Sequence, residues 1–84
     1  MNQDFPEVID GCYIVQFRDT ESLVVLDTDL NLVTSDKQKV FLVYLSLAAA
    51  KSYVQNVIEK STNVEGVVYN SKQEIIEVLV PLLA

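Results

Sequence analysis

Apolar and polar residues alternate with a period of two along several short segments of this chain. Such alternation is typical of β-strands that bury one face. In one segment, Tyr13, Val15 and Phe17 alternate with the residues between them. This alternation predicts a strand over residues 12–17, and apolar segments bounded by polar turns predict further strands over residues 23–27, 31–35, 40–45 and 64–69.

Three of these segments also predict how the sheet is built. Residues 40–45 are apolar on both faces and rich in β-branched and aromatic side chains, which predicts a central strand. Residues 23–27 and 31–35 flank an Asp-Thr-Asp-Leu-Asn run, and Asx residues are common in short turns. We therefore expect these two segments to form the arms of a hairpin.

One segment has the period of an amphipathic helix. Its apolar residues recur at helical spacing and form a stripe. The stripe consists of Leu47, Ala50, Val54, Val57 and Ile58. Ser46 precedes it, where a hydroxyl can accept a hydrogen bond from an early backbone N–H group. The sequence predicts one main helix over about residues 47–61.

The C-terminal segment, residues 74–80, fits two structures. Ser71 and Glu74 match a capping box ahead of apolar residues, which favours a second helix. Residues 75–80 are dominated by β-branched side chains, and the polar residues before them could form a hairpin turn, which favours a strand. The sequence leaves both alternatives open.

The order of these elements predicts an α+β fold. We expect a small, mainly antiparallel sheet of about five to six strands packed on one main helix. A chain of 84 residues has room for one hydrophobic core, so we expect a single domain over residues 1–84. Residues 1–10 are mostly polar and contain Pro6, which suggests a flexible arm or a weak edge.

The predicted sheet has more apolar faces than one helix can cover. If residues 74–80 form a strand, the face opposite the helix lacks cover from the same chain. An uncovered apolar face is typical of an interface. We therefore expect a homodimer or a stable complex with another protein, whereas a C-terminal helix would remove most of this argument.

Charge is distributed unevenly along the chain. Residues 1–36 hold eight acids and one base, a net −7, and residues 37–84 hold four acids and five bases, a net +1, for a total of −6. An acidic surface favours basic partners and speeds their association. The candidate partner-binding residues lie in the predicted turns. They are Asp19, Glu21, Asp27, Asp29 and Asp36.

Other chemistry finds little support in the sequence. Asp27, Asp29 and Asn31 open like a calcium-binding loop, but Leu32 replaces its glycine and Gln38 its bidentate glutamate. Cys12 is the single cysteine and there is no histidine, so a zinc site or a Cys–His nucleophile lacks ligands and partners. We expect no catalytic, metal or cofactor site.

The composition also argues against two classes of partner. Nucleic-acid binding requires clustered basic residues, and only Lys37 and Lys39 lie close together. No apolar run reaches the length of a transmembrane helix, and the first residues do not resemble a secretory signal. We expect a cytoplasmic protein that binds neither nucleic acid nor membrane.

These features favour a non-enzymatic protein-interaction module. One version is an acidic inhibitor or immunity-type protein that binds a basic partner, an analogy of size and charge alone. One alternative is a small enzyme or ligand-binding domain whose site lies at a dimer interface. Another alternative is a structural subunit.

Overall fold

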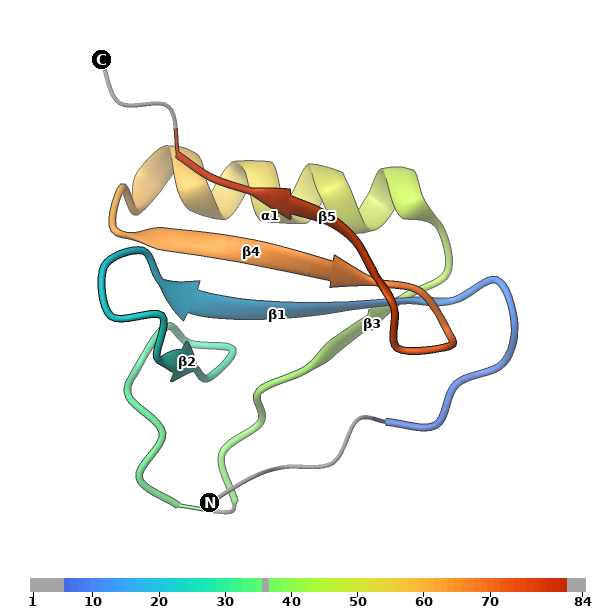
Figure 1. The fold of residues 1–84 in the computed structure, drawn as a ribbon, viewed down its shortest axis with the longest axis horizontal. Helices are drawn as coiled ribbons and strands as arrows, with labels where there is room; N and C mark the ends of the chain where they lie inside the picture. The colour runs from blue at the N-terminus through green and yellow to red at the C-terminus, as the bar shows by residue number, and fades with distance from the viewer. Residues whose placement is uncertain (1–5, 36, 82–84) are drawn as a thin grey trace.

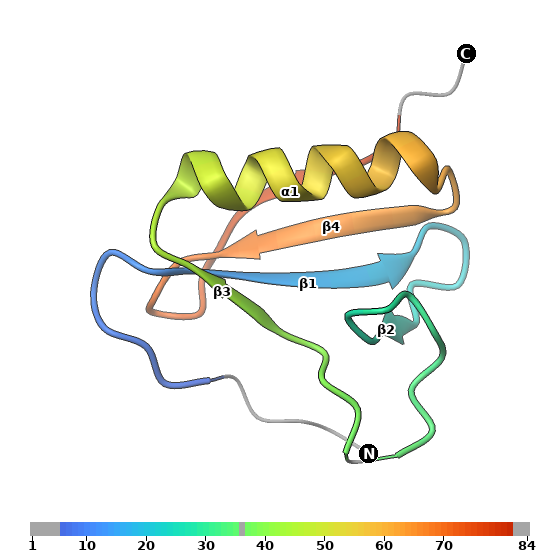
Figure 2. The same ribbon diagram turned by 180° about the vertical axis from the view of Figure 1, so that it is seen from behind.

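The computed structural model describes residues 6–35 and 37–81 and shows an α+β fold. A five-stranded antiparallel sheet packs against one helix, which lies behind the sheet in Figure 1 and in front of it in Figure 2. The elements along the chain are β1 (Tyr13–Asp19), β2 (Val25–Leu26), β3 (Leu42–Tyr44), α1 (Leu47–Lys60), β4 (Val64–Tyr69) and β5 (Ile75–Leu79). The predicted fold class is confirmed.

The centre of the sheet is formed by β1 and β4. The strand order is β2-β1-β4-β5, and β3 also pairs with β1. Tyr13 to Val15 pair with β3, whereas Phe17 and Arg18 pair with β2, so these two short strands share one edge of β1. The prediction that residues 40–45 form a central strand is therefore wrong, because β3 lies at the edge of the sheet.

The predicted hairpin over residues 23–35 is largely replaced by irregular structure. Its first arm shortens to the two residues of β2, and its second arm pairs only through an isolated bridge between Leu26 and Leu32. The backbone takes positive φ angles of 61° at Leu23 and 66° at Leu30. A regular ladder cannot continue through residues in this left-handed region.

Helix α1 ends one residue before its predicted limit. The Ser46 hydroxyl accepts a hydrogen bond from the Ala49 N–H at 3.1 Å, as expected of an N-cap. Ala50, Val54 and Ile58, each four residues apart, are buried against the sheet. They join Val15, Phe17, Leu26, Val64 and Val68 in the main core.

The C-terminal segment is a strand, which resolves the two alternatives for residues 74–80. Asn70 builds the preceding turn, because its side-chain oxygen accepts hydrogen bonds from the N–H groups of Lys72 and Glu74. Its own N–H donates to the Glu74 carbonyl at 3.0 Å. Gln73 has a φ of 67° in this turn. The Asn70 side chain thus stabilises a hairpin turn, and β5 runs back along β4.

The face of the sheet opposite α1, called the far face below, is covered over only part of its area. Ile14, Val40 and Phe41 form a second buried cluster there, packed against partly buried residues that include Val8. Val40 and Phe41 thus cover β1 from the segment that leads into β3. Val8 belongs to the predicted N-terminal arm, so that arm contributes to the packing.

Candidate functional site

The outer edge of β5 is the longest unpaired strand edge in the described part of the chain. β5 pairs with β4, with Val67 opposite Val78 and Val68 opposite Glu77. Among residues 6–35 and 37–81, no other strand pairs with it. An unpaired edge presents backbone N–H and C=O groups to which another chain can bond.

Exposed apolar side chains are concentrated along this strand and at Val80, just beyond its end; Ile75, its first residue, is 58% exposed. Ile76, Val78 and Val80 are 41%, 38% and 56% exposed. Glu77 and Leu79 face the helix, because Glu77 pairs with Lys51 at 3.1 Å and Leu79 packs against the main core. Since successive side chains alternate between faces, the side chains at positions 76, 78 and 80 project from the far face. We call Ile76, Val78 and Val80 the β5 patch.

Two of the usual protections of an edge strand occur at the two ends of this patch, and a third, an exposed charge, does not. Edge strands are commonly protected by charged side chains, proline or bulges. Here Pro81 follows the patch, and a bulge lies within β5, because Val68 pairs with Glu77 and Tyr69 with Ile75, which leaves Ile76 as the extra residue. Glu77, the acidic residue within β5, faces the helix and is paired with Lys51. The far face of β5 is therefore open to another apolar surface.

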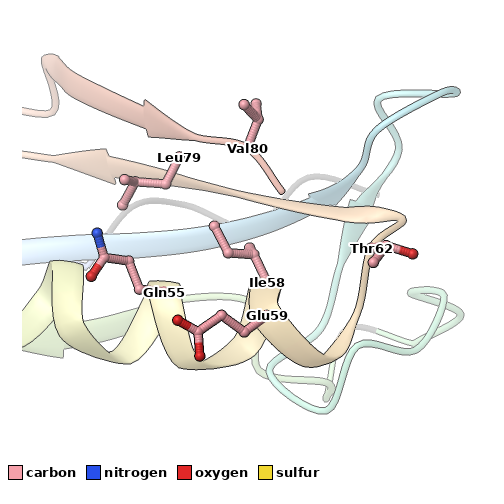
Figure 3. Close-up of a pocket in the computed structure, with 6 residues that line it drawn as sticks. All are labelled: Gln55, Ile58, Glu59, Thr62, Leu79 and Val80. Carbon is pink, nitrogen blue, oxygen red and sulfur yellow. The ribbon is translucent and has the colours of Figure 1, made fainter. Parts of the chain in front are cut away.

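A hollow of about 540 Å³ lies between α1 and β5. Figure 3 shows Ile58 and Leu79 directed into the space between helix and strand, with Val80 directed away from the helix. The remaining lining residues are Gln55, Glu59 and Thr62. The hollow therefore adds a mixed polar and apolar surface directly beside the β5 edge.

Some carboxylates of the predicted acidic site accept hydrogen bonds from their own loops, and others are exposed to solvent. Asp19 Oδ1 accepts hydrogen bonds from the N–H groups of Glu21 and Ser22, each at 2.9 Å. These backbone donors, Ser22 first, lower the pKa of the Asp19 carboxyl below its ordinary value. The carboxylate of Asp19 thus holds the β1–β2 turn, whereas the side chain of Glu21 is exposed.

The Asp27 carboxylate also stabilises its own loop by accepting hydrogen bonds. Asp27 is 6% exposed, and its Oδ1 accepts from the N–H groups of Asp29 and Asn31 at 2.9 Å each. Its Oδ2 accepts from Gln38 Nε2 at 2.6 Å. The Asn31 N–H and then the Gln38 amide lower the pKa of the Asp27 carboxyl. Sequence reasoning missed this role of Gln38, because the contact joins residues eleven positions apart.

The structure brings two of the predicted acidic turns to one part of the molecule. The turn with Glu21 precedes β2 and the turn with Asp29 follows it. Both of these side chains are exposed. Asp36 lies outside the described residues. Of the four predicted residues that the structure describes, Glu21 and Asp29 are the exposed ones, and they lie at the opposite edge of the sheet from β5.

The Asp27 loop predicts a specific response to acid. A carboxyl whose pKa is lowered by folding stabilises the protein above its ordinary value of 3.8 and loses that contribution as pH falls through the folded value. We expect Asp27→Asn to lower the melting temperature at pH 7 and to weaken its decline between pH 5 and pH 3. Thermal melts followed by circular dichroism measure both effects.

Asp29→Asn is the matched control, because Asp29 lies two residues away and its side chain is exposed. It should melt like the wild-type chain at each pH. An Asp27→Asn variant with the wild-type melting temperature and pH profile would contradict the structural role of this carboxylate.

Within the described residues, no group of three or more Asp, Glu, Cys or His side chains is placed to hold a metal ion. No helix in residues 6–35 and 37–81 has the length and hydrophobicity to cross a membrane. Comparisons with protein-family models, curated proteins and solved structures gave no match.

Proposed function

We propose that this chain is a non-enzymatic protein-interaction module that binds its partner at the β5 edge. The observation that carries the proposal is the coincidence of an unpaired strand edge with three exposed apolar side chains on one face. An extended partner segment can add to such an edge, with main-chain hydrogen bonds giving affinity and alternate side chains giving specificity.

The β5 patch provides the apolar part of this contact. Its side chains stand two residues apart, so they line up on the far face and meet every second side chain of an added strand. Burial of apolar surface contributes roughly 25 cal/mol per Å². Val67, which pairs with Val78, is fully buried, so the exposed apolar surface here is that of β5 itself.

The exposed acids suggest a basic partner surface as a second contact. Glu21 and Asp29 flank β2, at the opposite edge of the sheet, and the chain carries a net charge of −6. Exposed charges of this kind steer association, and their effect is screened over about 10 Å at 0.1 M salt. Binding through these turns should therefore weaken as salt increases, whereas apolar contact at β5 should persist.

A capture experiment with four versions of the immobilised chain tests the two contacts separately. Val78→Glu places a charge in the β5 patch. Val43→Glu is its matched control, because Val43 is a 45% exposed valine of an edge strand at the other side of the sheet. A Glu21→Gln/Asp29→Asn double variant neutralises the accessible acids. Each version is exposed to cell extract at low and at high salt.

We expect bound protein to be lost with Val78→Glu and kept with Val43→Glu. The neutralised variant should lose only the salt-sensitive part of the bound material. Equal retention by the wild-type chain and by Val78→Glu would refute the β5 edge as the binding surface.

A further inference from the structure

We infer that the partner at the β5 edge is a second copy of this chain, paired strand to strand in antiparallel orientation about a two-fold axis through Val78. This inference depends on the proposed function, because it names the occupant of the same edge. In the resulting dimer the two sheets join into one, and both helices lie on the same side.

The apolar pattern of β5 is self-complementary about Val78. With the axis at this residue, Val78 opposes Val78 of the second copy, and Ile76 opposes Val80 of the second copy. Opposing residues in an antiparallel pair place their side chains on the same face, with Cβ atoms about 4.5–5.5 Å apart. The whole β5 patch of each copy therefore meets the β5 patch of the other. A two-fold interface requires this self-complementarity.

Neighbouring registers are less favourable. An axis at Glu77 would place the two Glu77 carboxylates directly opposite each other, and like charges in this position are destabilising. An axis at Leu79 would bring Pro81, which has no N–H group to donate to the ladder, opposite Glu77, whereas the axis at Val78 brings it opposite Ile75, at the end of the pairing. With the axis at Val78, Glu77 opposes Leu79 of the second copy and keeps its contact with Lys51 in its own chain.

Charges on α1 complement each other across the same axis. Lys51 lies beside Glu77, whereas Glu59 lines the hollow together with Leu79 and Val80, so α1 runs in the direction of β5. The two-fold axis reverses this direction in the second copy. Lys51 of one copy then lies at the level of Glu59 of the other, and this pairing of opposite charges occurs twice.

The spacing of the sheet leaves room for this arrangement. Neighbouring strands are about 4.8 Å apart, so the two copies of β4 would lie about 14 Å from each other. Helices in direct contact are about 8–10 Å apart. The two hollows beside β5 then face each other between the helices.

Measuring the molecular mass of the purified chain at increasing concentration tests directly whether two copies form a dimer. A single strand pair lies at the small end of specific interfaces, so we expect dissociation on the order of micromolar. Analytical ultracentrifugation from about 1 µM to 1 mM should show a monomer that becomes a dimer. Val78→Glu should weaken dimerisation at least about tenfold, which is about 1.4 kcal/mol, and Val43→Glu should leave it unchanged.

Cysteine cross-linking tests the register. In a Cys12→Ala background, Val78→Cys should form a disulfide-linked dimer in a glutathione buffer, because opposing strand residues have Cα atoms within the disulfide range. Ile76→Cys alone should not cross-link, since its opposite residue is Val80. An equal mixture of Ile76→Cys and Val80→Cys chains should cross-link. Circular dichroism checks that each variant is folded.

The outcomes separate this inference from the proposed function. A dimer that cross-links through Val78→Cys supports both the pairing of two copies and the proposed binding function of the β5 edge. A chain that stays monomeric at 1 mM overturns the second copy, and so does a dimer that cross-links at Ile76→Cys alone. If the monomeric chain still captures another protein that Val78→Glu does not, the proposed function stands. If it captures none, both are wrong.

Discussion

Replacing Gly66 with alanine is expected to destabilise the chain by about 2 kcal/mol, with valine costing more. Gly66 lies in β4 under the middle of α1, where a Cβ atom would overlap the Val54 side chain. Even the more distant Val54 atoms, Cγ2 and Cβ, would be only 3.2 and 3.3 Å away. Val54 is fully buried, so relief requires the helix or the sheet to move.

A second substitution tests whether the close packing of Gly66 and Val54 is the cause. Val54→Ala alone leaves a cavity and should cost about 2–3 kcal/mol. In the Gly66→Ala/Val54→Ala double variant, the new methyl group occupies part of that space. We expect the double variant to be more stable than the sum of the single effects by about 1 kcal/mol or more, measured by urea unfolding. Strict additivity would show that the two residues do not compete for the same volume.

A helix or strand is predictable from this sequence when the residues that specify it are close together along the chain. Helix α1 has a capping serine and a complete apolar stripe, and both are visible within sixteen residues of chain. Strand β4 has the predicted limits, Val64 to Tyr69. In both elements the residues that specify the structure are neighbours in sequence, so the periodicity carries most of the information.

The position of a strand within the sheet is not a local property. Residues 40–45 are apolar on both faces, as in a central strand, yet they form an edge. Val40 and Phe41 are buried because they fold onto the far face of β1, whereas Leu42 and Tyr44 pack toward α1. The first residues of this segment therefore pack on the far face of the sheet, and the following ones pack on the helix side. The composition of the segment is the same as that of a strand covered on both sides.

The candidate site was predictable only in outline. The sequence shows acids in turns, but their availability depends on backbone N–H groups and on Gln38, which bind Asp19 and Asp27. The expected uncovered face is likewise smaller than the pattern indicates, because Val33, Val40 and Phe41 cover its β1 side. The exposed part remains at β5, a position that the sequence did not indicate.

Removing the positive charge of Arg18 is expected to cost about 3 kcal/mol. Arg18 Nη2 lies 2.8 Å from Glu65 Oε2, and Nε donates to the same oxygen at 2.9 Å. The Glu65 side chain is only 8% exposed. Arg18→Met keeps much of the packing volume but leaves this carboxylate buried without its partner. A chain of 84 residues has a stability of roughly 4–13 kcal/mol, so the loss is a large fraction.

An Arg18→Met/Glu65→Leu double variant separates the cost of an unpaired charge from the value of the pair. Replacing both members of a buried ion pair with apolar residues is often neutral or stabilising. We expect the double variant to unfold in urea within about 1 kcal/mol of the wild-type chain, well above Arg18→Met alone. Equal losses in the single and double variants would mean that the ion pair itself contributes the stability.

The same double variant bears on how the far face selects its partners. Arg18 and Glu65 lie opposite each other on β1 and β4, next to Val67, which adjoins Val78 of the β5 patch. Arg18→Met adds an apolar side chain where that of Arg18 is 28% exposed, whereas position 65, only 8% exposed, adds little surface. If the chain pairs through β5 as inferred, the variant should associate beyond a dimer at concentrations where the wild-type chain does not, as measured by light scattering. The ion pair would then serve chiefly to confine the apolar contact to the edge, which limits association to one geometry.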